Sequence, residues 1–156
     1  MKVSAGILLF RERQGRVEVL LVHPGGPYWA KKDTGAWTIP KGAVDEGEEL
    51  LTAARREFEE ETGSPAKGEA VPLMPRRQPG GKVVHAWAVR GDLDATAIRS
   101  STFTMEWPPR SGRQQEFPEV DRGAWLTLDE ARGKILKGQA AFLDDLAQLL
   151  RGEGAR

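Results

Sequence analysis

The residues with the clearest capacity for chemistry are three glutamates near the end of one acidic segment. Glu57, Glu60 and Glu61 have the i, i+3, i+4 spacing that places side chains on one face of a helix. Each like-charged pair at this spacing costs a helix about 0.2–0.5 kcal/mol, and the negative end of the helix dipole disfavours anions there. A solvated charged face is the ordinary explanation of such a run. A divalent cation would offset the repulsion, and carboxylate oxygens suit Mg²⁺ or Mn²⁺.

The helix that must carry these glutamates is expected from about residue 46 to residue 62. Asp45 and Glu48 have the spacing of a capping box, and Gly63 is a typical C-terminal stop. An apolar arc next to the acidic face is expected to pack on the core, and it consists of Leu50, Leu51, Ala54 and Phe58.

The rest of the chain predicts a sheet covered by helices. Strands are expected over 3–12, 16–23, 82–90 and 120–127, the first two joined by a hairpin turn at Gln14-Gly15. The strand at 82–90 is apolar on both faces, which is typical of a buried strand. Helices are expected over 128–136 and 139–150, and a proline-rich loop over 107–118.

Length and composition exclude several classes of protein. The chain has 156 residues with 23 basic and 23 acidic side chains and no cysteine, so it has no disulfides or thiolate metal sites. The zero net charge argues against a nucleic-acid partner, and no apolar run is long enough to span a membrane. We expect a single cytoplasmic domain over residues 1–150, with a frayed tail at 151–156.

The acidic segment resembles the signature box of the Nudix hydrolases, the MutT-like pyrophosphohydrolases. The matching positions are Gly42, Glu48, Arg56, Glu57, Glu60, Glu61 and Gly63, within residues 42–64. A chance match at seven fixed positions is expected roughly once in 10⁸ placements. The segment departs from the family pattern at Phe58 and Ser64, which concern packing rather than chemistry. The Pro40-Lys41-Gly42 lead-in is similar to that of diadenosine polyphosphate hydrolases.

The resemblance implies an α/β/α sandwich with a mixed sheet, whose box forms a loop–helix–loop. It implies metal-dependent hydrolysis, with Mg²⁺ or possible Mn²⁺ substitution, of a pyrophosphate linkage in a nucleoside triphosphate or dinucleoside polyphosphate. In this sequence the implied metal ligands are Glu57, Glu60 and Glu61, with the Gly42 carbonyl and a later carboxylate, Glu119 or alternatively Glu116. Arg56 would orient a neighbouring glutamate, Glu57 or Glu61 would lie near the attacking water, and Glu48 and Gly63 would support the box.

The substrate contacts are predicted less directly. Lys41 could bind phosphate as a point charge, and Tyr28 or Trp37 could stack on a base, although a core position suits Trp37 equally well. His85 would contact substrate only if its strand borders the cleft, and a structural role is favoured. Two alternative functions stay open, namely hydrolysis of non-nucleotide pyrophosphates and nucleotide sensing without catalysis.

Overall fold

The computed structural model describes residues 2–154, and its centre is a seven-stranded mixed sheet. The long strand β1 (Val3–Arg13) pairs in parallel with β6 (Val83–Arg90) and antiparallel with β2 (Arg16–Pro24). The short strand β3 (Lys41–Ala43) pairs with the start of β1, on the opposite side from β6. The sheet is completed by β9 (Val120–Thr127) beside β2, and by β4 (Ala70–Pro72) and β5 (Arg76–Arg77) beside β6.

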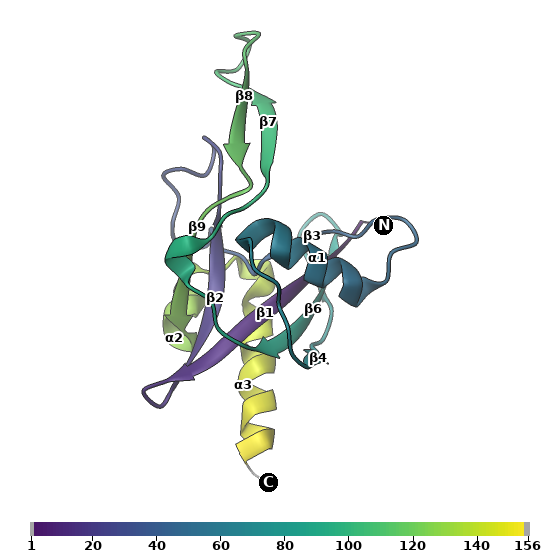
Figure 1. Ribbon diagram of the computed structural model, residues 1–156, viewed down its shortest axis with the longest axis vertical. Coiled ribbons are helices and arrows are strands. Elements are labelled where there is room, and N and C mark those ends of the chain that lie inside the picture. Colours follow the sequence, from purple (N-terminus) through teal and green to yellow (C-terminus); the bar gives the residue numbers. More distant parts are fainter. Residues whose placement is uncertain (1, 155–156) are drawn as a thin grey trace.

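Helices cover both faces of this sheet, which confirms the expected α/β/α sandwich (Figure 1). One face packs against α1 (Leu50–Thr62), where Ile7 and Leu9 of β1 meet Ala54 and Phe58. The other face packs against α2 (Leu128–Lys134) and α3 (Ala140–Gly154), and α3 passes behind β1 in Figure 1. Alternate residues of β1 therefore belong to two separate cores. Short 3₁₀ turns, Ala95–Ala97 and Lys137–Gln139, complete the elements.

The boundaries of the acidic helix follow the prediction at one end only. Gly63 is left-handed with φ 81° and its N–H donates to the Glu59 carbonyl at 2.8 Å, as expected of a glycine stop. The helix begins at Leu50 rather than near residue 46, because Gly47 has φ 78° and interrupts helical geometry. Glu48 does accept the Asp45 N–H at 3.0 Å, but this contact closes a turn before the helix.

The prediction of a loop over residues 107–118 is wrong for its second half, because residues 114–118 form a strand. Strands β7 (Thr102–Glu106) and β8 (Gln114–Pro118) pair antiparallel and form an arm that projects from the body (Figure 1). Strand β7 alternates, with Phe103 and Met105 partly buried, whereas β8 has one partly buried residue, Phe117, which packs on Phe103. Only residues 107–113 form a loop, at its tip.

The other strands and helices that the sequence predicts are present in the structure, with a difference at the C-terminus. Gln14 and Gly15 have φ 53° and 75°, as a two-residue hairpin turn requires. Helix α3 continues to Gly154, so residues 151–154 are helical rather than frayed, and residues 155–156 lie outside the described part. No helix within residues 2–154 is both long and apolar enough to cross a membrane.

Candidate active site

The acidic flank of α1 rests on the backbone of β3. The carboxylate of Glu57 occupies the space beside the Gly42 Cα, where a Cβ would overlap it. The Glu61 Oε1 accepts the backbone N–H of Lys41 at 3.1 Å. Glycine is therefore required at 42 for the close approach of Glu57, and the two carboxylates lie side by side along one short strand.

Arg56 connects the acidic groups around the start of this flank. Its guanidinium donates to Glu48 at 2.8 and 2.9 Å, to Glu57 at 2.9 Å, to Glu60 at 3.1 Å and to the Ala43 carbonyl at 3.1 Å. The hydrogen bonds from Arg56, followed by that from the Asp45 backbone, lower the pKa of Glu48 to about 2. These contacts fit the predicted roles, in which Arg56 orients a neighbouring glutamate and Glu48 supports the box.

The two glutamates against β3 are held in an environment that disfavours their charge. Burial raises the pKa of Glu61 to about 8. The positive charge of Lys41 opposes this rise, and the negative charges of Glu57 and Glu119 add to it. Burial also raises the pKa of Glu57, although the hydrogen bond from Arg56 opposes it. The negative charge of these two partly buried carboxylates is not fully balanced by neighbouring positive charge. Such an imbalance is typical of functional sites.

Of the two candidate outer carboxylates, only Glu119 lies at this site. After the larger effect of burial, its charge adds to the raised pKa of Glu61, and its backbone is tied through Ser101 to the end of α1. Glu116 instead lies on β8 opposite Thr104, exposed on the projecting arm. The structure thus favours Glu119 and leaves the alternative, Glu116, away from the cluster.

A chain of backbone hydrogen bonds sets the position of Glu119. The Ser101 N–H donates to the Glu60 carbonyl at 2.7 Å, and the Glu119 N–H donates to the Ser101 carbonyl at 2.9 Å. The Glu119 carbonyl in turn accepts the Gly25 N–H at 2.9 Å. The root of the arm is therefore tied to the end of α1 on one side and to the end of β2 on the other.

The donor chemistry of these residues fits a divalent cation. Glu57, Glu61 and Glu119 supply hard oxygens, and the raised pKa values of Glu57 and Glu61 indicate that a cation beside them would be favourable. Within residues 2–154 no three acidic or histidine side chains converge closely enough to enclose an ion. In this arrangement Arg56 donates to Glu57 and Glu60, while the Lys41 N–H donates to Glu61.

Two lysines lie beside the carboxylates, and the sequence indicated only one of them. The positive charge of Lys41 opposes the burial that raises the pKa of both Glu57 and Glu61. Burial, followed by the charges of Lys41 and Lys2, lowers the pKa of Lys82, while Glu57 and Glu61 oppose that shift. Lys82 was missed because it merely precedes an apolar strand, and no local pattern tells which residues lie opposite it.

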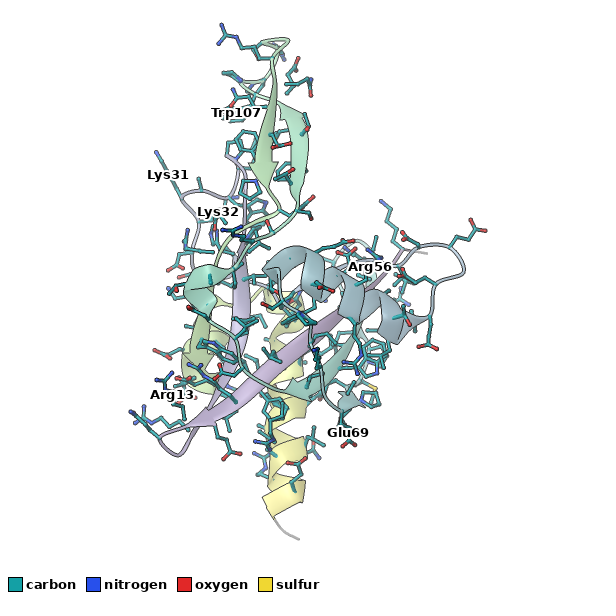
Figure 2. All side chains as sticks on the ribbon, in the orientation of Figure 1. Arg13, Lys31, Lys32, Arg56, Glu69 and Trp107 are labelled. Carbon is teal, nitrogen blue, oxygen red and sulfur yellow. The ribbon has the colours of Figure 1, made fainter. Side chains whose placement is uncertain are left out.

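The aromatic candidates separate into core and surface. Trp37 is only 6% exposed and its indole N–H donates to Asp33 at 2.8 Å, so it belongs to the core and has no open face for a base. Tyr28 is 58% exposed and packs edge-on against Trp107 of the arm, with ring centroids 5.3 Å apart. Figure 2 shows Trp107 beside the loop that carries Lys31 and Lys32, and Arg56 on α1.

The remaining candidate, His85, is half-buried on β6. It lies opposite Ala5 on the side of the sheet that packs against α1. Gly42 pairs with Ala5 from the other side, so β1 separates His85 from the carboxylate pair. This position agrees with the favoured structural role.

A separate groove does not compete with this site for charged ligands. It has a volume of about 570 Å³ and lies between β4 and α3. Two of its three acidic residues, Asp145 and Glu153, are paired with Arg76 and Arg90, and the third is Glu69. The carboxylates beside β3, by contrast, retain an excess of negative charge.

With this geometry established, comparison with known proteins identifies the family. The NUDIX domain model matches residues 1–146, so the chain belongs to the Nudix family. An RNA pyrophosphohydrolase of Caulobacter vibrioides is 46% identical over 57 residues, which is 33% of each protein. The asymmetrical bis(5′-nucleosyl)-tetraphosphatase of Caenorhabditis elegans is 40% identical over 58 residues, 37% of this chain and 38% of that protein. The matches thus span only about a third of these relatives.

Solved structures share the whole fold at low identity. A binary complex of the C. elegans Ap4A hydrolase aligns with a TM-score of 0.68 at 23% identity, covering 97% of this chain and 99% of that one. The NUDIX domain of Shewanella oneidensis NrtR, solved with ADP ribose, aligns with a TM-score of 0.66 at 17% identity, covering 95% and 87%. At these identities the structures support the fold alone.

We predict that Glu61→Gln stabilises the metal-free protein. With a folded-state pKa near 8 against an ordinary 4.5, Glu61 contributes a stability that is complete below pH 4.5 and lost as the pH rises to 8. The neutral amide does not titrate, so the variant should exceed the wild type by at least about 1 kcal/mol at pH 8. Urea unfolding in EDTA at pH 4 and pH 8 measures this difference. The exposed Glu59→Gln is the control, and an unchanged pH dependence in Glu61→Gln would contradict the prediction.

A second prediction concerns Gly42→Ala. The new methyl group must displace the flexible Glu57 carboxylate rather than backbone, so the fold should persist while the acidic pair is separated. We expect Mn²⁺ affinity, measured by isothermal titration, to fall about tenfold or more with little change in thermal unfolding. Gly152→Ala is the matched control, because a Cβ there meets open space. Equal Mn²⁺ affinity in the two variants would show that the Glu57 position is irrelevant to the cation.

Proposed function

We propose that this chain hydrolyses a pyrophosphate linkage in a nucleoside polyphosphate with the help of Mg²⁺ or Mn²⁺. The observation that carries the proposal is the pair of partly desolvated carboxylates, Glu57 and Glu61, held against β3 with Lys41 beside them. Membership of the Nudix family and the names of the relatives support the same reaction.

In the proposed reaction, water attacks one phosphorus atom and the bond to the bridging oxygen breaks. A carboxylate, Glu57 or Glu61, takes the proton of the attacking water, and the second phosphate leaves with the bridging oxygen. A bound divalent cation would offset the negative charge of the phosphates and lower the pKa of the water. Glu57, Glu60, Glu61 and Glu119 are the residues that would hold it, with the Gly42 carbonyl as a further oxygen.

The other side chains prepare this site. Arg56 holds Glu57 in place through a 2.9 Å hydrogen bond and is itself anchored on Glu48. Lys41 would meet the phosphate chain from the far side of the carboxylates, as a positive charge without an ion pair in the described part of the chain. Tyr28, exposed beside Trp107, is the aromatic surface best suited to stack on a base.

The substrate within this class is a nucleoside triphosphate or a dinucleoside polyphosphate. The likeness to RNA pyrophosphohydrolases adds the 5′-triphosphate end of RNA as a second candidate, contrary to the expectation drawn from the net charge. A sensor without catalysis is less favoured, because the box glutamates are all present and gathered on one flank of α1.

A substrate panel tests the proposal. It comprises nucleoside triphosphates, a dinucleoside tetraphosphate, ADP-ribose, inositol pyrophosphate and a 5′-triphosphorylated RNA, with products resolved by chromatography. We expect Mg²⁺-dependent turnover of at least one nucleotide that EDTA abolishes. Cleavage of inositol pyrophosphate alone, or tight binding without cleavage, would contradict the proposal.

We further predict that Glu61→Gln lowers kcat by about 10²–10⁴-fold, because the reaction loses a proton acceptor and a cation ligand. Circular dichroism and urea unfolding should show an intact fold. The exposed Glu59→Gln should retain the wild-type rate. Full activity of Glu61→Gln would refute the assignment of this carboxylate.

A further inference from the structure

The arm formed by β7 and β8 lies against the loop that follows β2, residues 25–35. A Cβ on Gly25 would overlap the Pro118 carbonyl, and a Cβ on Gly26 would approach the Phe103 ring to 2.9 Å. The arm and this loop therefore hold each other in place and present one continuous surface, which we call the arm–loop surface.

Two aromatic rings meet on the arm–loop surface. Tyr28 of the loop and Trp107 of the arm pack edge-on, with ring centroids 5.3 Å apart and ring planes at 81°. Tyr28 is 58% exposed, and within residues 2–154 it shares the status of an exposed large hydrophobic residue only with Met74. Trp107 is itself partly exposed. Exposed aromatic rings are the surfaces on which nucleobases stack.

Basic side chains lie on both sides of this aromatic pair. Lys31 and Lys32 lie on the loop beside Trp107 (Figure 2), and Arg110 and Arg113 lie in the tip of the arm. Among residues 2–154, none of these four side chains forms an ion pair with a carboxylate.

Most of the acidic charge of the arm–loop surface is engaged within the protein. Asp33 pairs with Lys134, and Glu106 accepts the backbone N–H groups of the arm tip at 3.1 and 3.0 Å. Glu116, exposed on β8, is the third acidic residue of the two segments. Four unpaired cations therefore favour an anionic ligand here, although the net charge of the whole chain is zero.

The length of the arm decides between a small and a long ligand. The arm begins at Glu119, whose N–H donates to the Ser101 carbonyl and whose carbonyl accepts the Gly25 N–H, both at 2.9 Å. The five residues of β8 span roughly 17 Å from there to the tip, at about 3.4 Å per residue. A small nucleotide bound near Glu119 would leave the tip empty, whereas a strand of several nucleotides would cover the whole arm.

We propose that the arm–loop surface binds a single strand of nucleic acid. Tyr28 and Trp107 stack on its bases, and Lys31, Lys32, Arg110 and Arg113 contact its phosphates. An unpaired strand offers base faces and regularly spaced negative charges together, which matches the alternation of rings and cations on this surface. The proposal goes beyond the proposed function, because binding of a strand requires no hydrolysis.

Replacement of Tyr28 tests the stacking. Binding of a short, fluorescently labelled 5′-hydroxyl oligoribonucleotide is measured by anisotropy in EDTA. We expect Tyr28→Ala to lose about fivefold or more in affinity, whereas Tyr28→Phe keeps the ring and should stay within twofold of the wild type. A duplex of the same sequence should bind more weakly than the single strand, because its base faces are covered. Unchanged affinity in Tyr28→Ala, or tighter binding of the duplex, would overturn the proposal.

The salt dependence of the same binding tests the cations. Each phosphate contact to a single strand contributes about 0.7 to the slope of log K against log salt concentration. The double variant Arg110→Gln with Arg113→Gln should therefore have a slope shallower by about 1.4. The matched control is Arg13→Gln with Lys67→Gln, two exposed cations outside this surface, of which Arg13 lies at the opposite end of the molecule (Figure 2). Equal slopes in the two double variants would contradict the phosphate contacts.

Sedimentation velocity distinguishes a nucleic-acid strand from a second copy of this chain as the occupant. We expect the protein to sediment in the same form with and without Tyr28→Ala. Self-association that Tyr28→Ala abolishes, together with no oligonucleotide binding, would overturn the proposal. None of these measurements requires turnover, so absence of hydrolysis across the substrate panel would leave the strand-binding surface standing, and absence of strand binding would leave the proposed function intact.

Discussion

The arrangement of the whole site depends on the contact between α1 and β3 at Gly42. A residue without a Cβ lets the Glu57 carboxylate approach the strand backbone, and the backbone N–H of the preceding residue, Lys41, donates to the Glu61 carboxylate. This contact partly buries both carboxylates, and burial disfavours their ionised form. Arg56 offsets part of this effect for Glu57, and the burial of Glu61 itself raises its pKa to about 8.

The central position of β1 brings the opposing charges together. Lys41 and Lys82 are far apart in the sequence. Because β3 and β6 pair with β1 from opposite sides, both lysines nevertheless lie at the same end of the sheet. The arm formed by β7 and β8 is rooted at the same place, since Ser101 bonds to the end of α1 and Glu119 bonds to Ser101. Acidic and basic groups are thus positioned by backbone pairing rather than by flexible loops.

Local patterns in the sequence determined much of this protein. The apolar runs of β1, β2 and β6, the turn at Gln14-Gly15 and the helix stop at Gly63 could be predicted because each depends on neighbouring residues alone. The spacing of the acidic box indicated the family for the same reason, since its residues lie close together in the sequence. The start of that helix was misjudged because the positive φ of Gly47 outweighs an otherwise helical pattern.

Tertiary structure alone decided the features that depend on pairing between distant segments. The position of Glu119 at the root of the arm, and of Glu116 on β8, follows from backbone hydrogen bonds, and β8 has too few apolar residues to be recognised in isolation. Trp37 is a core residue because the chain folds over it, whereas its sequence context suited a role in stacking on a base equally well. The position of Lys82 relative to the carboxylates follows from the pairing of β6 with β1. Strand pairing joins residues that are far apart in the sequence, so no local pattern predicts it.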